Sequence, residues 1–224
     1  MDLFSYYCKL TINFLDQTIA LTMALGTLFI ISAPSGAGKT SLVSELLTRL
    51  DNIQVSVSHT TRQSRSGEQD GVNYHFISRQ QFESMIEEQK FIEHAEVFGN
   101  YYGTSEEWVS STLNRGVDVI LEIDWQGADQ VRNKFPRSKS IFILPPSKQA
   151  LRERLTGRGQ DEESVIAKRV AAATEEMKHC NDADYVVIND QFEAACNQLQ
   201  AIVEVQRCET NSQQHKKLLI DLLS

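Results

Sequence analysis

A glycine-rich segment at residues 33–40 has the residue types that phosphate chemistry needs. It consists of Ala33, Pro34, Ser35, Gly36, Ala37, Gly38, Lys39 and Thr40. The segment matches the phosphate-loop pattern GxxxxGK[ST], except that alanine replaces the first glycine. Gly36 and Gly38 allow backbone N–H groups to turn toward phosphate oxygens. Lys39 can reach the β- and γ-phosphates of a nucleotide, and the Thr40 hydroxyl can bind Mg²⁺.

The residues on either side of this loop support the same interpretation. The apolar run at residues 27–33 predicts a buried strand, and apolar residues at positions 42, 43, 46, 47 and 50 predict one face of a helix. The alternative is a glycine-rich turn with a surface lysine. The order strand, loop, helix favours a nucleoside triphosphate site with phosphoryl chemistry, but it does not name the acceptor.

A second basic segment could hold another phosphate. Arg62 and Arg65 are three residues apart, and Tyr74 follows them. Two guanidinium groups and a phenol can clamp a phosphate by charge-assisted hydrogen bonds. Taken alone, this segment fits a solvated basic loop better than a binding site.

Glu93 lies within an apolar stretch at residues 91–98. A buried carboxylate is costly unless it meets donors. Guanine offers such donors at N1–H and N2–H₂, whereas adenine does not, so a site of this kind would reject adenine. A strand with outward-facing acids and a tyrosine-containing turn explains the same residues equally well.

Carboxylates also occur at the end of the apolar run at residues 117–124. Glu122 and Asp124 resemble the end of a Walker-B strand, where an aspartate assists Mg²⁺ or orients the substrate. The alternative is that Asp124 caps the next helix.

Three arginines surround two glycines further along the chain. Arg154, Arg158 and Arg169 flank Gly157 and Gly159, which suits a hinged lid that neutralises charge on transferring phosphates. An exposed pair of charged helices is the alternative.

The elements that must position these residues alternate along most of the chain. Strands are expected at residues 27–33, 53–57, 117–124, 140–144 and 185–188. Helices are expected at about 80–89, 149–155, 162–178, 192–205 and 216–223, and a short helix is expected from residue 126. Five apolar strands separated by helices predict an α/β fold with a doubly wound parallel sheet. The loop at 33–40, Asp124 and Asn189 all follow strands, where such sheets bind ligands. Residues 58–104 break the alternation and predict an antiparallel insertion with a strand at 72–77.

Composition narrows the function further. The 224 residues carry a net charge of −8, which argues against a nucleic-acid surface. No apolar run approaches the roughly 20 residues of a membrane span. The four cysteines form no CxxC pair, which argues against a zinc site. They are too sparse for a disulfide framework, which suits a reducing compartment and predicts a cytoplasmic protein. The first 22 residues read as a dispensable extension, and Met23 is an alternative start.

Together these segments resemble guanylate kinase, most closely its bacterial members. The matched segments are 33–40, 58–62, 91–104, 123–127, 140–146 and 157–159. The resemblance implies a P-loop nucleoside monophosphate kinase fold of three layers. It divides the chain into an extension (1–24), a core (25–57 and 105–224) with a helical lid at about 150–170, and a GMP-binding insertion (58–104).

The resemblance also implies a role for each site residue, with ATP as the phosphoryl donor, GMP as the acceptor and Mg²⁺ as the metal. Ser58, Glu93 and Thr104 would contact guanine, and Arg62, Arg65, Tyr74 and Tyr102 would hold the GMP phosphate. Asp124 would orient the acceptor. Lys39, Arg158 and Arg169 would stabilise the transferring group with support from Arg154, and Asn189 would lie near adenine.

Two departures and two alternatives accompany this resemblance. Glu122 stands where family members usually have aspartate, so its role is open, and the first 22 residues lie outside the match. A phosphopeptide-binding module of the same fold would usually lack the intact phosphate loop seen here. A kinase acting on a ribose bisphosphate would not need Glu93. Apolar residues in the segment 216–223 could pack on the core or on a partner subunit, so a homo-oligomer is one outcome.

Overall fold

The computed structural model describes residues 26–97, 99–157, 163–209 and 221–223. The expected extension at 1–24, Arg158, Gly159 and most of the expected helix at 216–223 therefore lie outside the described residues. Within the described ranges, no helix has both the length and the apolar character needed to cross a membrane.

A five-stranded sheet forms the centre of the protein, in the order β2-β7-β1-β8-β9. Every neighbouring pair is parallel. Each strand matches one of the five expected, which confirms the predicted parallel sheet. The bounds are β1 Leu28–Ser32, β2 Ile53–Val55, β7 Asp118–Glu122, β8 Lys139–Leu144 and β9 Tyr185–Ile188.

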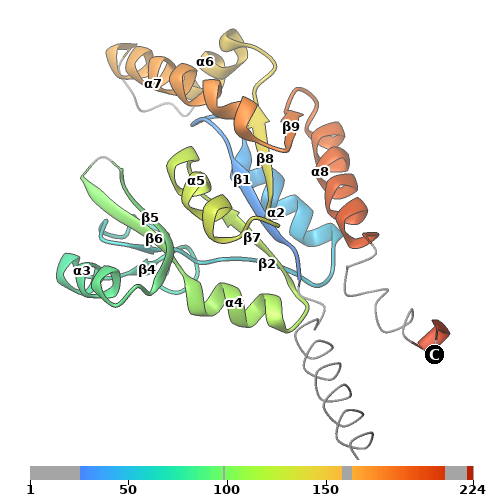
Figure 1. Cartoon of the computed structure of the whole chain (residues 1–224). Helices are drawn as coiled ribbons and strands as arrows, with labels where there is room; N and C mark the ends of the chain where they lie inside the picture. Colours follow the sequence, from blue (N-terminus) through green and yellow to red (C-terminus); the bar gives the residue numbers. More distant parts are fainter. Residues whose placement is uncertain (1–25, 98, 158–162, 210–220, 224) are drawn as a thin grey trace, which may run out of the picture.

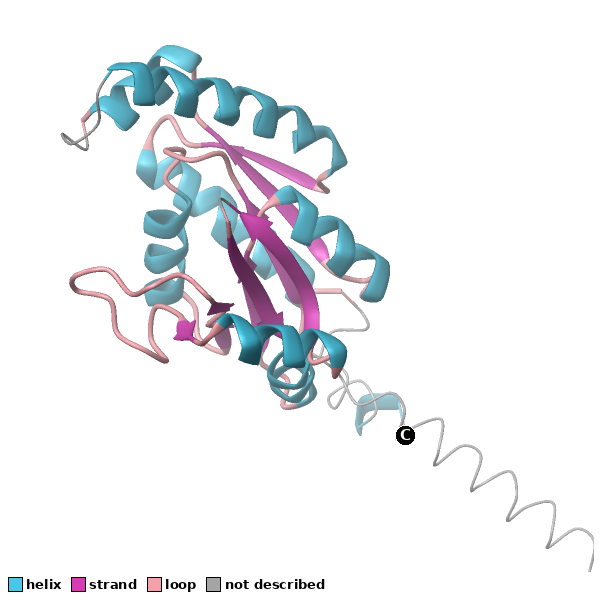
Figure 2. Cartoon of the chain, turned by 90° about the vertical axis from the view of Figure 1, so that its left-hand side faces the viewer, coloured by secondary structure: helices cyan, strands magenta, loops and turns pink. Residues whose placement is uncertain are grey.

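Helices cover both faces of this sheet and complete three layers (Figures 1 and 2). On one face, α2 (Lys39–Arg49) and α8 (Phe192–Arg207) pack against Phe29 and Ile31 of β1. On the other face, α4 (Glu106–Asn114) and α5 (Trp125–Lys134) pack against Leu28 and Ile30. Since successive side chains of a strand point to opposite faces, β1 contributes alternate residues to two cores and is buried throughout.

A second sheet, in the order β4-β3-β6-β5, occupies the segment expected to be an insertion. Its strands are β3 His59–Thr60, β4 His75–Phe76, β5 Phe91–Val97 and β6 Asn100–Ser105, with α3 at Arg79–Glu87. β6 pairs antiparallel with β3 and β5, whereas β3 and β4 are parallel. The strand expected at 72–77 is shorter, because Gly71 N–H bonds to Tyr74 C=O and Val72 N–H to Gln69 C=O in a turn.

The sequence did not predict β6 and α4, nor the two-residue strand β3. β6 forms where a tyrosine-containing turn was the alternative, because it pairs with β5 from Ser105 to Asn100. α4 begins directly after β6, where the Ser105 hydroxyl accepts a hydrogen bond from Trp108 N–H. Acidic residues at Glu106 and Glu107 also favour the start of this helix.

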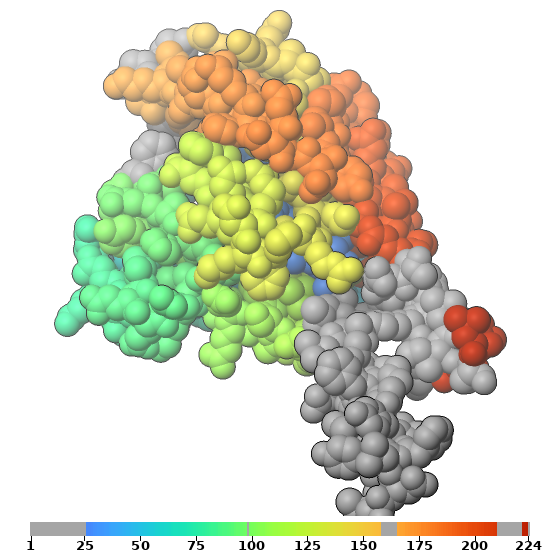
Figure 3. All heavy atoms as spheres, viewed as in Figure 1, coloured from blue at the N-terminus to red at the C-terminus, as the bar shows by residue number. Residues whose placement is uncertain are grey.

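Two helices, α6 (Lys148–Thr156) and α7 (Glu163–Glu176), lie above the carboxyl end of the core sheet in Figure 1. A 3₁₀ turn, η1 (Met177–Asp182), follows α7, contacts β8 and leads into β9. Leu151, Leu155 and Ala173 form a small apolar cluster that joins α6 to α7. Figure 3 shows α5 on the surface between the second sheet and α7.

Candidate active site

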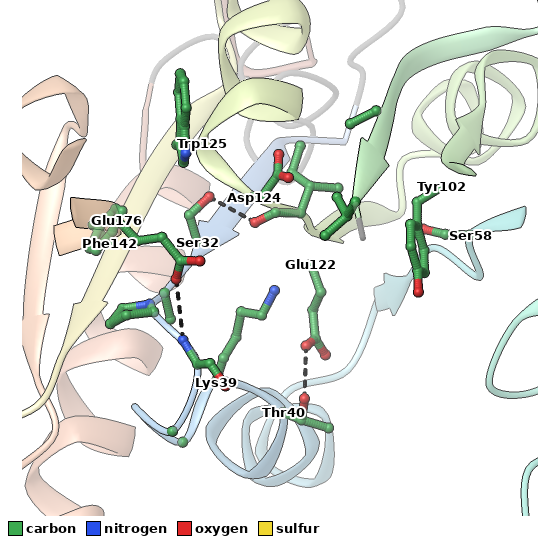
Figure 4. A pocket seen from close by; sticks show the side chains of 18 of the residues that line it. Ser32, Lys39, Thr40, Ser58, Tyr102, Glu122, Asp124, Trp125, Phe142 and Glu176 are labelled. Atoms are coloured by element: carbon green, nitrogen blue, oxygen red, sulfur yellow. Dashed lines mark hydrogen bonds between the residues drawn. The ribbon is translucent and has the colours of Figure 1, made fainter. Parts of the chain in front are cut away.

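A cavity of about 470 Å³ lies where the core sheet, the second sheet and α7 meet. The loop after β1, the end of β7 and the second sheet all line it (Figure 4). Glu176, the last residue of α7, lines it as well. The structure thus brings residues from distant parts of the sequence to one site, at the carboxyl ends of parallel strands.

The loop at residues 33–38 has a backbone shape that depends on glycine. Gly36 and Gly38 have φ values of 91° and 94°, which L residues rarely adopt. Asn189 closes the loop from the side, because its Nδ2 donates to Ala37 C=O at 2.7 Å. A Cβ on Gly38 would lie 2.5 Å from that Nδ2. The expected place of Asn189 near adenine stays a prediction, since its described contact is with the loop.

Lys39 is the first residue of α2 and is partly buried beside the loop. Burial lowers the pKa of its ammonium, while the carboxylates of Glu122, Asp124 and Glu176 act in the opposite direction. Thr40 follows, and its hydroxyl donates to Glu122 Oε2 at 3.2 Å. A cation therefore lies among three carboxylates at the end of the cavity next to the loop.

Asp124 serves the fold and lines the cavity at the same time. Its Oδ1 accepts a hydrogen bond from Gly127 N–H at 2.9 Å and caps α5, as the alternative interpretation expected. Asp124 and Glu122 both line the cavity with Thr40. The described residues contain no group of three or more His, Cys, Asp or Glu that could hold a metal alone. A few oxygens of this kind fit Mg²⁺, which usually takes its other ligands from substrate phosphates and water.

Glu93 is buried at the opposite part of the cavity, in β5, and is 4% exposed. The Thr104 hydroxyl donates to Glu93 Oε1 at 2.6 Å, and Ser58 Oγ lies 3.4 Å from Thr104 Oγ1. Burial raises the pKa of Glu93 to about 7, with a further contribution from Asp124. Gly127 leaves room for this carboxylate, because a Cβ there would lie 2.7 Å from Oε2.

The expected arginine clamp contains a residue that the sequence did not single out, Glu68. Arg62 forms a two-pronged ion pair with it, with N···O distances of 2.8 and 3.0 Å. Glu68 also accepts a hydrogen bond from Arg65 N–H at 2.7 Å. The Arg62 guanidinium lies 5.4 Å from the ring centroid of Tyr74, which lines the cavity together with Tyr102. Glu68 thereby fixes Arg62 beside the cavity wall.

Two expected lid arginines reach the core. Arg169 of α7 donates to Ser35 Oγ at 3.3 Å, and Arg154 of α6 donates to Asn189 C=O at 2.8 Å. Glu176 accepts a hydrogen bond from Ser35 N–H at 3.3 Å and, like Glu68, was not expected from the sequence. Arg158 lies outside the described residues.

Comparison with known protein families shows which family shares this set of site residues. The family model described as guanylate kinase matches residues 26–206. The chain belongs to the guanylate kinase family. The match covers both sheets, the loop at residues 33–40, and helices α6 and α7, so it includes every expected site residue.

Individual guanylate kinases show the same relation. The chain is 59% identical to the guanylate kinase of Saccharophagus degradans, over 89% of this chain and 98% of that one. It is 59% identical to the guanylate kinase of Hahella chejuensis, over 86% and 92%. The crystal structure of guanylate kinase from Anaplasma phagocytophilum superposes with a TM-score of 0.72 at 33% identity, covering 88% of this chain and 95% of that one.

Proposed function

We propose that the chain transfers the γ-phosphoryl group of ATP to GMP, giving ADP and GDP, as membership of the guanylate kinase family implies. The observation that carries the proposal is one cavity with a glycine phosphate loop at one end and the Glu93–Thr104–Ser58 cluster at the other. The first suits a triphosphate, and the second suits a base with adjacent N–H donors. The activity places the protein in purine nucleotide metabolism, where it recycles GMP.

The donor would bind at the loop of residues 33–40. Backbone N–H groups of the loop and the Lys39 ammonium supply positive charge for its phosphates. Asn189 contacts the loop at Ala37 C=O and Arg154 contacts Asn189 C=O, so both would extend the site toward the rest of ATP. Thr40, with the nearby Glu122 and Asp124, would hold Mg²⁺, which neutralises phosphate charge when it is bound.

The acceptor would bind against the second sheet. Glu93 would accept hydrogen bonds from N1–H and N2–H₂ of guanine, next to Ser58 and Thr104. Tyr74 and Tyr102 line the adjoining wall, and the Arg62 guanidinium lies over the Tyr74 ring. These groups and Arg65 would hold the GMP phosphate by charge-assisted bonds.

Transfer then needs positioning and charge neutralisation more than a strong base. A phosphate oxygen of GMP is already a nucleophile at neutral pH, and Asp124, which lines the same cavity, would orient it. Lys39, Arg169 and Arg158 would stabilise negative charge on the transferring group. Closure of α6 and α7 over the cavity would exclude the water that hydrolyses ATP.

The net charge and the cysteine content of the chain bear on its partners and its cellular compartment. The net charge of −8 disfavours nucleic acid as a partner, and the sparse cysteines suit the cytoplasm. The small-molecule substrates are the partners that the cavity accounts for. Assembly into a homo-oligomer stays a prediction, to be measured by light scattering.

A coupled assay of ADP formation tests the proposed reaction. GMP, dGMP, AMP and ribose phosphates are offered in turn as acceptors, with ATP and Mg²⁺. We expect GMP to be preferred over AMP by roughly 10⁴-fold, because adenine leaves the Glu93 carboxylate unpaired. ADP formation that is no faster with GMP than with AMP would overturn the guanine assignment.

A further inference from the structure

Glu176 is a carboxylate inside the phosphate site. It is the last residue of α7, it lines the cavity, and its Oε2 accepts a hydrogen bond from Ser35 N–H (Figure 4). Ser35 belongs to the loop whose N–H groups serve the donor phosphates in the proposed function. A protein carboxylate therefore uses a hydrogen-bond donor of the anion site, on the same side as Lys39.

The charges around Glu176 resemble those that a phosphate would meet. Burial, the largest cause, raises the pKa of the Glu176 carboxyl, and Asp124 acts in the same direction, whereas the hydrogen bond from Ser35 N–H and the Lys39 ammonium favour its ionised form. The Arg169 guanidinium lies at the same loop residue, through Ser35 Oγ. The Glu176 carboxylate thus accepts a hydrogen bond from Ser35 N–H and is attracted by the Lys39 ammonium, while the Asp124 carboxylate repels it.

Glu176 and Arg169 act from one face of one helix. They are seven residues apart, which is about two helical turns, so their side chains project to the same side of α7. Both contact Ser35, the acid at the backbone and the arginine at the hydroxyl. This double contact holds α7 against the phosphate loop.

We propose that Glu176 is a positioning residue that occupies the phosphate loop as an internal anion and that ATP must displace. The inference rests on the proposed function, because it assigns the loop to ATP. The incoming phosphates take the Ser35 N–H group and repel the Glu176 carboxylate, while they attract Arg169. Displacement therefore breaks the contact of Glu176 with the loop and keeps that of Arg169. Helix α7 would then contact the bound triphosphate through Arg169.

The energetic consequence is a reduced affinity for ATP. Only molecules whose loop is free of Glu176 bind the donor fully, so the apparent Kd is raised by the inverse of that fraction. Removing the carboxylate should remove this competition. Because bound ATP has already displaced Glu176, the change should appear in the KM for ATP rather than in kcat.

The test compares Glu176→Gln and Glu176→Ala with wild type and with Glu175→Gln. Glu175 is the adjacent residue, is exposed, and pairs with Lys178 outside the cavity. ATP and GMP affinities are measured by calorimetry, and kinetics by the coupled assay. We expect about three- to tenfold tighter ATP binding in both position-176 variants, an equal fall in the KM for ATP, and an unchanged kcat. GMP affinity and the Glu175→Gln variant should match wild type.

Two results would overturn the inference in distinguishable ways. If wild type phosphorylates GMP but both position-176 variants bind ATP no more tightly than it does, with melting temperatures retained, Glu176 does not compete and the proposed function stands. If wild type neither binds ATP nor forms ADP with GMP, the proposed function and the inference both fail. Glu176→Gln is nearly isosteric, so its result stands even where Glu176→Ala does not fold.

Discussion

The buried Glu93 makes GMP binding depend on pH. Burial, the largest cause, raises the pKa of this carboxyl to about 7, while hydrogen bonds from Thr104 act in the opposite direction. Only the ionised carboxylate can accept hydrogen bonds from both N1–H and N2–H₂ of guanine. GMP should therefore select the ionised form and release a proton when it binds at neutral pH.

The magnitude follows from the pKa. With a pKa of about 7, roughly a tenth of Glu93 is ionised at about pH 6 and roughly nine tenths at about pH 8. The apparent Kd is the intrinsic Kd divided by the binding-competent fraction, so GMP should bind about tenfold more weakly at about pH 6. At about pH 7, binding should release roughly half a proton.

Calorimetry in buffers of different ionisation enthalpy measures both quantities. The GMP phosphate titrates in the same range, so Glu93→Gln serves as the control: it keeps the phosphate titration and removes that of residue 93. We expect wild type to lose about tenfold more affinity between about pH 8 and about pH 6 than the variant does. Parallel pH dependences in the two proteins would refute the reasoning.

The same shift has a consequence for the ligand-free fold. The folded-state pKa of Glu93 lies above the ordinary value of 4.5, so the native state favours the protonated carboxyl. Its contribution to stability is fully present below about pH 4.5 and is lost as pH rises through about 7. Adding GMP should reverse that loss, because guanine stabilises the ionised form.

Three substitutions test other parts of the site. Lys39→Ala should abolish ADP formation in the coupled assay while GMP binding by calorimetry stays within about twofold, because the ammonium serves the transferring group. Arg62→Ala should instead weaken GMP binding by about tenfold or more, and equal losses of GMP affinity in both variants would contradict this division. Gly38→Ala should lower the free energy of unfolding in urea by about 1–3 kcal/mol and impair ATP binding, because φ is 94° and the new Cβ would meet Asn189. Gly67→Ala is the control, because Gly67 has a similar φ of 89° but a Cβ there would meet no atom within 4 Å. An equal loss of unfolding free energy in the two variants would show that the contact with Asn189 contributes nothing.

The core sheet was predictable because its strands are buried on both faces. A strand such as β1 needs apolar residues at every position, and that run is visible in the sequence without knowledge of its partners. The glycine loop was predictable for a related reason, since its backbone shape restricts the residues that can form it. Both signals are local.

β6 was not predictable because its strand character comes from its neighbours. Residues 100–105 are mostly polar or aromatic, and their backbone groups are satisfied by β3 and β5. The ring of Tyr101 packs on Phe82 of α3, with centroids 5.3 Å apart. For α4, a local signal was present: Ser105 followed by Glu106 and Glu107 is typical of a helix start.

In the site, the sequence analysis singled out the charged residues expected to contact a ligand. It missed the acids that pair with those residues or compete with the ligand. Glu68 and Glu176 are ordinary acids by composition. Their significance comes from contacts with Arg62 and with Ser35 N–H, which arise only after distant segments meet. The Asn189 contact with Ala37 C=O joins residues 152 positions apart and was invisible for the same reason.

The central place of β1 also has a consequence for biosynthesis. β1 is hydrogen-bonded between β7 and β8, whose paired residues follow it by about 90 positions or more. At about 5–20 residues per second, the ribosome exposes this apolar strand and its phosphate loop for several seconds before either partner exists. The β5–β6 hairpin joins neighbouring segments and needs no such delay. The loop that would bind ATP is thus synthesised early and assembled late, and the nascent chain is most prone to aggregate until β8 has emerged.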